Sequence, residues 1–200
     1  MGMFVNLWIK LFFVLTPFFG LTMFLSLTEN YDETQRRKLA LSVSFSVALI
    51  SLILFFVGQQ IFSILGITLD SFRVGAGILL LLSGIGIVQG KVSMTGAVTD
   101  GDVAVVPLAI PIIVGPATTG TILVMGAELT TIATKLTGCC ALISAVTTVG
   151  AILCAGSMLK NALGARGIAI LSRLTGLILS AMAAQMIMTG IQRFFTLSCI

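Results

Sequence analysis

The feature that most constrains this chain is a series of long hydrophobic stretches, two of which are interrupted by proline and glycine at similar places. One interruption covers residues 16–20 (Thr-Pro-Phe-Phe-Gly) in the first stretch, and the other covers residues 111–120 in the fourth. Lipid offers no hydrogen bonds to backbone groups, so a broken helix persists in a membrane only where protein or a cavity satisfies the freed groups. Paired interruptions of this kind indicate the binding site of a transporter.

Composition places the chain in a membrane. Apolar residues make up 58% of it and charged residues 9%, with a mean hydropathy of +1.17. Such a chain needs a lipid bilayer as its partner. The basic residues lie between apolar segments rather than in a stripe with aromatics, which argues against a nucleic-acid partner. The chain has no histidine and no Cys-x-x-Cys spacing, which argues against a metal site, and no nucleophile–base pair points to an enzyme.

Charged residues divide the sequence into six apolar segments that approach or exceed the roughly 20 residues a spanning helix needs. Their approximate bounds are 9–28, 39–64, 74–90, 103–126, 136–159 and 174–191. The alternation of a membrane β-barrel is absent, so we expect an all-α membrane protein, a single domain over residues 1–200, with six transmembrane helices of which the first and fourth are broken.

The distribution of Lys and Arg predicts the orientation in the bacterial inner membrane. Loops after segments one, three and five carry seven basic residues, whereas the other side carries four. Because cytoplasmic loops are enriched in Lys and Arg, both termini are expected on the periplasmic side. The seven are Arg36, Arg37, Lys38, Lys91, Lys160, Arg166 and Arg173, and the four are Lys10, Arg73, Lys135 and Arg193.

The two halves of the chain resemble each other weakly. At an offset of 100 residues Gly20 matches Gly120 and Arg73 matches Arg173, while Pro17 matches Pro116 at an offset of 99. Three spans per half is an odd number, so two such repeats, about 1–95 and about 100–200, would lie in the membrane with opposite orientation. The alternative is chance matching between two glycine-rich apolar strings.

The interruptions supply the candidate site. Pro17 and Pro116 each remove a backbone donor and leave carbonyls without an intrahelical partner. If both helices break, two helix N-termini would meet near the membrane centre, where their N–H groups and dipoles favour a carboxylate. The further candidates are glycines, which let the chain turn or approach a neighbour closely, and threonines, which carry a hydroxyl. They are Thr16, Gly20, Gly115, Thr118 and Thr119. The alternative is that each proline only kinks a packed helix.

The remaining candidate residues are polar and lie near or within the apolar spans. Arg73 and Arg173 begin the third and sixth segments, where the favoured interpretation is contact with lipid phosphate and the alternative is a gating contact with the opposite half. Asp70 is close enough in sequence to pair with Arg73. Gln185 is a candidate for lining a cavity. No Asp or Glu lies deep in a span, so the sequence shows no proton carrier; Na⁺ held by freed carbonyls, H⁺ coupling and uncoupled movement all stay open, and no cofactor is indicated.

Several motifs resemble those of the MarC family, the small neutral amino acid transporter family. The most specific is Val-Pro-Leu-Ala-Ile-Pro at 106–111 followed by Gly115-Pro116, and the segments 72–79, 170–177 and 185–191 fit as well. The resemblance implies a six-span inner-membrane protein distantly similar to LysE-type exporters, with some relatives moving glycine and alanine. The chain departs from the family where Thr16 replaces an asparagine and Phe19 replaces a glycine, which bears on the range of substrates.

We therefore expect alternating-access transport of a small neutral amino acid, such as glycine or alanine, bound between the two interruptions. Two alternatives remain open: a non-transporting membrane scaffold or assembly protein, and an exporter of another small metabolite or drug. A homo-oligomer is compatible with this sequence.

Overall fold

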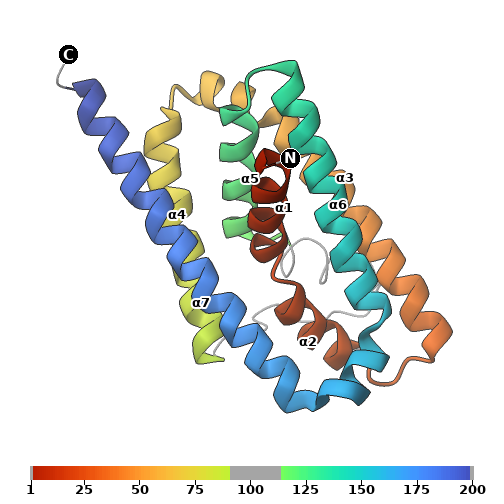
Figure 1. Ribbon diagram of the computed structural model, residues 1–200. Coiled ribbons are helices and arrows are strands. Elements are labelled where there is room, and N and C mark those ends of the chain that lie inside the picture. The colour runs from red at the N-terminus through yellow and green to blue at the C-terminus, as the bar shows by residue number, and fades with distance from the viewer. Residues whose placement is uncertain (1, 91–113, 199–200) are drawn as a thin grey trace.

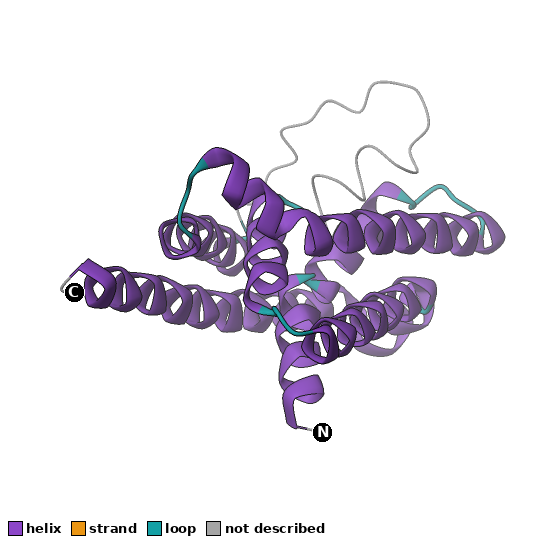
Figure 2. Ribbon diagram, turned by 90° about the horizontal axis from the view of Figure 1, so that it is seen from above, coloured by secondary structure: helices purple, strands orange, loops and turns teal. Residues whose placement is uncertain are grey.

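A computed structural model describes residues 2–90 and 114–198, and this part of the chain is entirely helical. Figure 2 shows helices joined by loops, without a strand among the residues described. The all-α prediction is confirmed for this part. The helices are α1 (Gly2–Val14), α2 (Pro17–Leu27), α3 (Glu33–Leu65), α4 (Leu69–Gln89), α5 (Pro116–Glu128), α6 (Ile132–Cys154) and α7 (Gly156–Ser198).

Five helical segments in the described ranges are long and apolar enough to cross a membrane. They are Gly2–Leu27, Glu33–Gly58, Leu69–Gln89, Ile132–Cys154 and Gly156–Phe195. The first part of the fourth predicted segment, residues 103–113 of 103–126, lies outside the described residues, as do the motif at 106–111 and Lys91. Only its second part is seen, as the 13-residue helix α5. The count of six spans therefore stays a prediction.

Two helices extend well beyond the apolar segments that predicted them. The helix expected from residue 39 begins at Glu33, because the Gln35 side chain accepts a hydrogen bond from the Asp32 N–H (3.1 Å) and caps the first turn. The helix expected over 174–191 is part of α7, whose backbone leaves the helical conformation at Gly164 (φ 67°, ψ 169°). A helix continues past the apolar band until a cap or a glycine ends it, whereas hydropathy marks only the part suited to lipid.

The helices alternate in direction through the molecule (Figure 1). α1 and α2 run one way, α3 returns and α4 runs back; α5, α6 and α7 repeat the sequence of directions in the opposite sense. α4 packs along α7, α3 along α5 and α6, and α1 along α6. Buried side chains of α1, α2, α3 and α6, with a few from α5 and α7, form the main core, which includes Leu11, Phe24, Val43, Leu142 and Val149.

Close backbone contact between α4 and α7 depends on glycine. A Cβ on Gly84 would lie 2.8 Å from the Gly176 carbonyl oxygen, and a Cβ on Gly176 would lie 2.8 Å from the Gly84 carbonyl oxygen. Helices in lipid associate through such small residues because no hydrophobic force drives them together. α4 and α7 thus form a closely packed helix pair.

At the end opposite Glu128 and Arg193, Arg36 ties three elements together. Its guanidinium donates to the Ser157 Oγ on α7 (2.7 Å), to the Thr28 carbonyl oxygen (2.7 Å) and to the Thr28 Oγ1 (3.2 Å). Charged groups donate stronger hydrogen bonds than neutral ones. The turn after α2 is therefore fastened to the start of both α3 and α7.

Candidate functional site

The first interruption is a sharp break between α1 and α2. Thr16 has left-handed backbone angles (φ 47°, ψ 57°), the single case of positive φ among the non-glycine residues described. A β-branched residue is strained in this conformation, and such strain persists only where the surroundings impose it. Thr16 is 6% exposed, and its carbonyl oxygen accepts the Gly20 N–H (2.8 Å) to begin α2. The break is therefore held by the packed interior.

At the second interruption the described residues begin a helix in the same way. Gly115 precedes Pro116, the first residue of α5, and its carbonyl oxygen accepts the Thr119 N–H (2.9 Å). In both breaks a proline occupies the first helical turn, where its missing N–H costs nothing. Neither helix has a side-chain cap, since the Thr16 hydroxyl makes no capping bond and Gly115 has no side chain.

Both helices therefore start with N–H groups that have no intrahelical acceptor. In α2 these belong to Phe18 and Phe19, and in α5 to Ala117 and Thr118. The aligned peptide dipoles add roughly half a positive charge at each helix start. Each break thus presents donors and positive potential without an ionised side chain.

A hydrogen bond joins the two breaks. The Thr118 Oγ1 of α5 donates to the carbonyl oxygen of Val14 (3.1 Å), the last residue of α1. Both residues are buried. The Val14 carbonyl is one of those left free where α1 ends. From the region of this bond α2 and α5 run in opposite directions (Figure 1).

The predicted site residues are not all gathered there. Thr16, Pro17, Gly20 and Thr118 are buried, and Gly115 and Thr119 are half-buried at the start of α5; Pro116 begins that helix. Gln185 instead lies exposed on α7, and its amide donates to the Thr189 Oγ1 of the same helix (3.4 Å). The structure does not place Gln185 among the buried residues of the breaks.

Two cavities lie beside α2, between it and α7. One of 160 Å³ includes Phe19 from the first turn of α2, and the other, of 190 Å³, extends toward Lys160. They share Thr22, whose hydroxyl lies 3.4 Å from the Ser172 Oγ of α7. Both are smaller than the roughly 300–1,000 Å³ of pockets for drug-sized ligands, which favours a small solute. Polar or charged lining residues are Thr22, Ser26, Glu29, Lys160, Ser172 and Arg173.

Arg73 and Arg173, which match at an offset of 100, have different surroundings. Arg73 is 2% exposed and pairs with Asp70 (2.5 Å) and with Glu128 at the end of α5. Its guanidinium therefore contacts the opposite half of the chain rather than lipid phosphate, so the expectation favoured from the sequence does not describe Arg73. The pairing with Asp70 is as expected. Arg173 is exposed and lines the 160 Å³ cavity.

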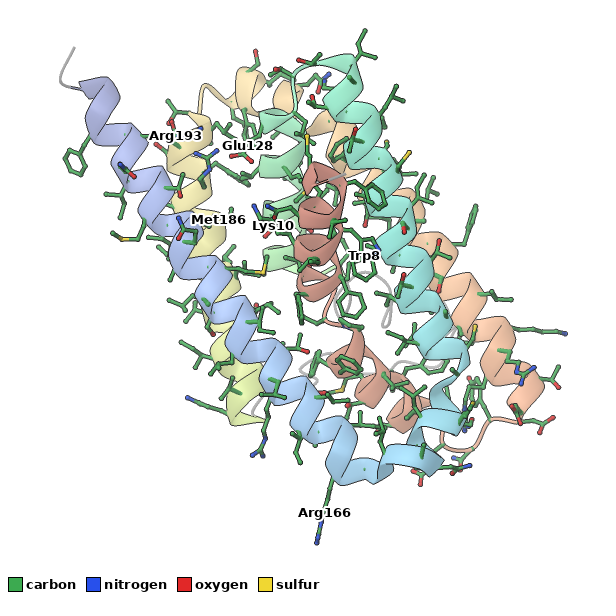
Figure 3. All side chains as sticks on the ribbon, viewed as in Figure 1. Trp8, Lys10, Glu128, Arg166, Met186 and Arg193 are labelled. Carbon is green, nitrogen blue, oxygen red and sulfur yellow. The ribbon has the colours of Figure 1, made fainter. Side chains whose placement is uncertain are left out.

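Several residues near the breaks and the cavities were not predicted from the sequence. Thr22, Ser172 and Glu128 belong to none of the predicted site features, although Glu29 and Glu128 match at the same offset of 99 as the two prolines. Lys10 is one of the four basic residues counted on the predicted periplasmic side, yet it lies within the first candidate span, on α1 (Figure 3). An ionisable residue within a span is by default a candidate functional residue.

Known proteins resemble the chain along nearly its whole length. The family model described as MarC family integral membrane protein matches residues 1–195. A UPF0056 membrane protein of Aquifex aeolicus is 29% identical over 198 residues, 95% of this chain and 92% of that protein. A UPF0056 membrane protein of Pyrococcus horikoshii is 35% identical over 203 residues, 96% of each chain. The UPF0056 membrane protein YhcE of Escherichia coli is 30% identical over 200 residues, 94% of this chain and 91% of that protein. No solved structure matches the chain.

Proposed function

Because the chain belongs to the MarC family of integral membrane proteins, we propose that it carries a small neutral amino acid, glycine or alanine in kind, across the bacterial inner membrane. The contact between the two breaks supports this proposal most directly. The Thr118 Oγ1 bonds the Val14 carbonyl, which brings together two helix starts without side-chain caps. Helix N-termini at the interface of two halves hold anionic groups of substrates in transporters with broken helices.

The chemistry of the breaks suits a zwitterion. The free N–H groups of α2 and α5 would bind the carboxylate, and the carbonyl groups left free where α1 ends would accept from the ammonium group. In the described part of the chain no Asp or Glu is buried, so no fixed negative charge repels the carboxylate there. The partial charges of backbone N–H and carbonyl groups suit a solute without net charge better than ionised side chains would.

We further propose that the two halves are inverted repeats. In the first half α3 covers residues 33–65 and is followed by Gly66 (φ 63°); in the second, α6 and the start of α7 cover 132–163 before Gly164 (φ 67°). α4 packs on α5, and the equivalent helix α7 packs on α2. The opposite directions of matching helices agree with an inverted relation (Figure 1). Such repeats allow alternating access by moving one part against the other.

The distribution of basic residues orients the molecule. Arg36, Arg37, Lys160 and Arg166 gather at the end opposite Glu128 and Arg193, where Figure 3 shows Arg166. We assign that end to the cytoplasm because basic residues are retained there, which leaves both termini periplasmic. The cavities beside α2 then lie on the cytoplasmic side. Movement coupled to Na⁺ or H⁺ and uncoupled movement are both compatible with this arrangement.

Uptake into proteoliposomes tests the proposal. Protein with Thr118→Val keeps nearly the same volume but loses the hydroxyl that joins the breaks, and we expect uptake of radiolabelled glycine or alanine to fall about tenfold or more, a loss typical of a mispositioned site. Thr147→Val is the matched control, since Thr147 is exposed on α6 and bonds only the carbonyl of Ile143 in its own helix. Equal uptake by both variants would contradict a site at the breaks. Absence of uptake by folded protein would favour a scaffold role or another solute.

A further inference from the structure

The two halves hold one equivalent threonine in different environments. Thr22 follows Pro17 by five residues, and Thr121 follows Pro116 by five. Each hydroxyl donates to the carbonyl four residues back, Phe18 or Ala117, at 2.9 Å. Thr22 is nevertheless exposed and lines both cavities, whereas Thr121 is only 8% exposed. The structure is therefore open beside α2 and closed beside α5.

An ion pair closes the α5 side. The guanidinium of Arg73 on α4, 2% exposed, bonds Glu128 at the end of α5. Behind this pair the helices touch closely, since a Cβ on Gly120 would lie 2.7 Å from the Cβ of Ala76. The ion pair and this contact hold α5 against α4, on the helix that carries the buried Thr121.

The α2 side carries the same two charges without the pairing. Glu29 follows Pro17 by 12 residues, as Glu128 follows Pro116, and Arg173 lies 100 residues after Arg73. Glu29 lines one cavity and Arg173 the other, with Thr22 common to both. Neither forms a salt bridge with any residue in the described ranges.

We propose that Glu29 and Arg173 are the second of two alternating gates, and that they pair when α2 closes onto α7 while the Arg73–Glu128 pair opens. Resting on the alternating access proposed above, this inference assigns each gate its acidic and basic residue. Exchange of one ion pair for its equivalent keeps the two states close in free energy, which a transporter needs in order to populate both. The cavities beside α2 are then the path that the second gate shuts.

Reporter cysteines at the two equivalent threonines test this inference without any solute. In full-length protein whose native cysteines are replaced by alanine, Thr22→Cys and Thr121→Cys are introduced singly and reacted with a water-soluble maleimide in detergent, where both sides are accessible. Glu128→Gln should raise labelling at position 121 and lower it at position 22, each by about fivefold or more, a typical lower value for coupling between sites. Arg73 keeps Asp70 as a partner in this variant, which favours a folded protein.

Glu29→Gln should have the opposite effect, lowering labelling at position 121 and raising or maintaining it at position 22. Arg173→Gln should reproduce this result, and Lys160→Gln, which removes the other cation of the same cavities, should not. A rise at both positions in Glu128→Gln would show mere loosening and would overturn the inference, as would unchanged labelling in Glu29→Gln. An effect of Lys160→Gln in place of Arg173→Gln would overturn the partner assigned to Glu29. If labelling changes in opposite directions at the two positions but glycine and alanine are not taken up, the gates stand and the proposed solute is wrong. If uptake occurs but labelling does not change in the variants, the transport proposal stands and the gates are wrong.

Discussion

At the scale of single residues, Arg73 shows how a charge is accommodated inside the helical bundle. It is almost fully buried, and two carboxylates from α4 and α5 neutralise it. A buried cation is tolerated only when paired and hydrogen-bonded. Arg37 offers a contrast, because its pair with Glu33 lies on the surface with both side chains more than half exposed.

Arg73→Ala should lower the free energy of unfolding by about 3 kcal/mol, the lower end for breaking a buried pair, since Glu128 retains access to water. Arg37→Ala should change it by no more than about 1 kcal/mol, as expected for an exposed pair. Denaturant unfolding of the purified proteins in detergent measures both. Equal effects of the two substitutions would contradict the burial of Arg73.

At the scale of helices, glycines determine how near α4 and α7 approach. Gly84 faces the backbone of α7, with Ser180 Oγ 2.5 Å from the position of an added Cβ, whereas an added Cβ on Gly75 of the same helix meets nothing within 4 Å. The two glycines share a helix and differ only in what they face. Alanine substitutions at the two positions therefore distinguish the effect of packing against α7 from the effect of helix propensity.

Gly84→Ala should destabilise the protein by about 1–3 kcal/mol through overpacking against α7. Gly75→Ala should stabilise it by roughly 0.5–1 kcal/mol, because alanine favours a helix interior and space is open. Apparent melting temperatures in one detergent give the comparison. A stabilising Gly84→Ala would show that α4 and α7 are further apart than described.

At the scale of the whole molecule, the hydropathy pattern and the prolines predicted most of the described helices, the break between α1 and α2, and the start of a helix at Pro116, since these are local properties. The family resemblance drawn from the motifs is confirmed by the match over residues 1–195. Contacts between residues that are distant in the sequence could not be predicted from it, because they depend on how the helices pack. The bond from Thr118 to Val14 and the burial of Arg73 against Glu128 depend on how α5 docks, and the sequence alone favoured lipid contact for Arg73.

The central claim is that the free N–H groups of two helix starts bind the carboxylate of a neutral amino acid. Competition for bound radiolabelled glycine on purified protein tests it most directly, with alanine and glycinamide as competitors. Alanine should displace glycine, whereas glycinamide, which keeps the amine but lacks the carboxylate, should not. Equal displacement by both compounds, or the absence of saturable glycine and alanine binding by folded protein, would contradict the account.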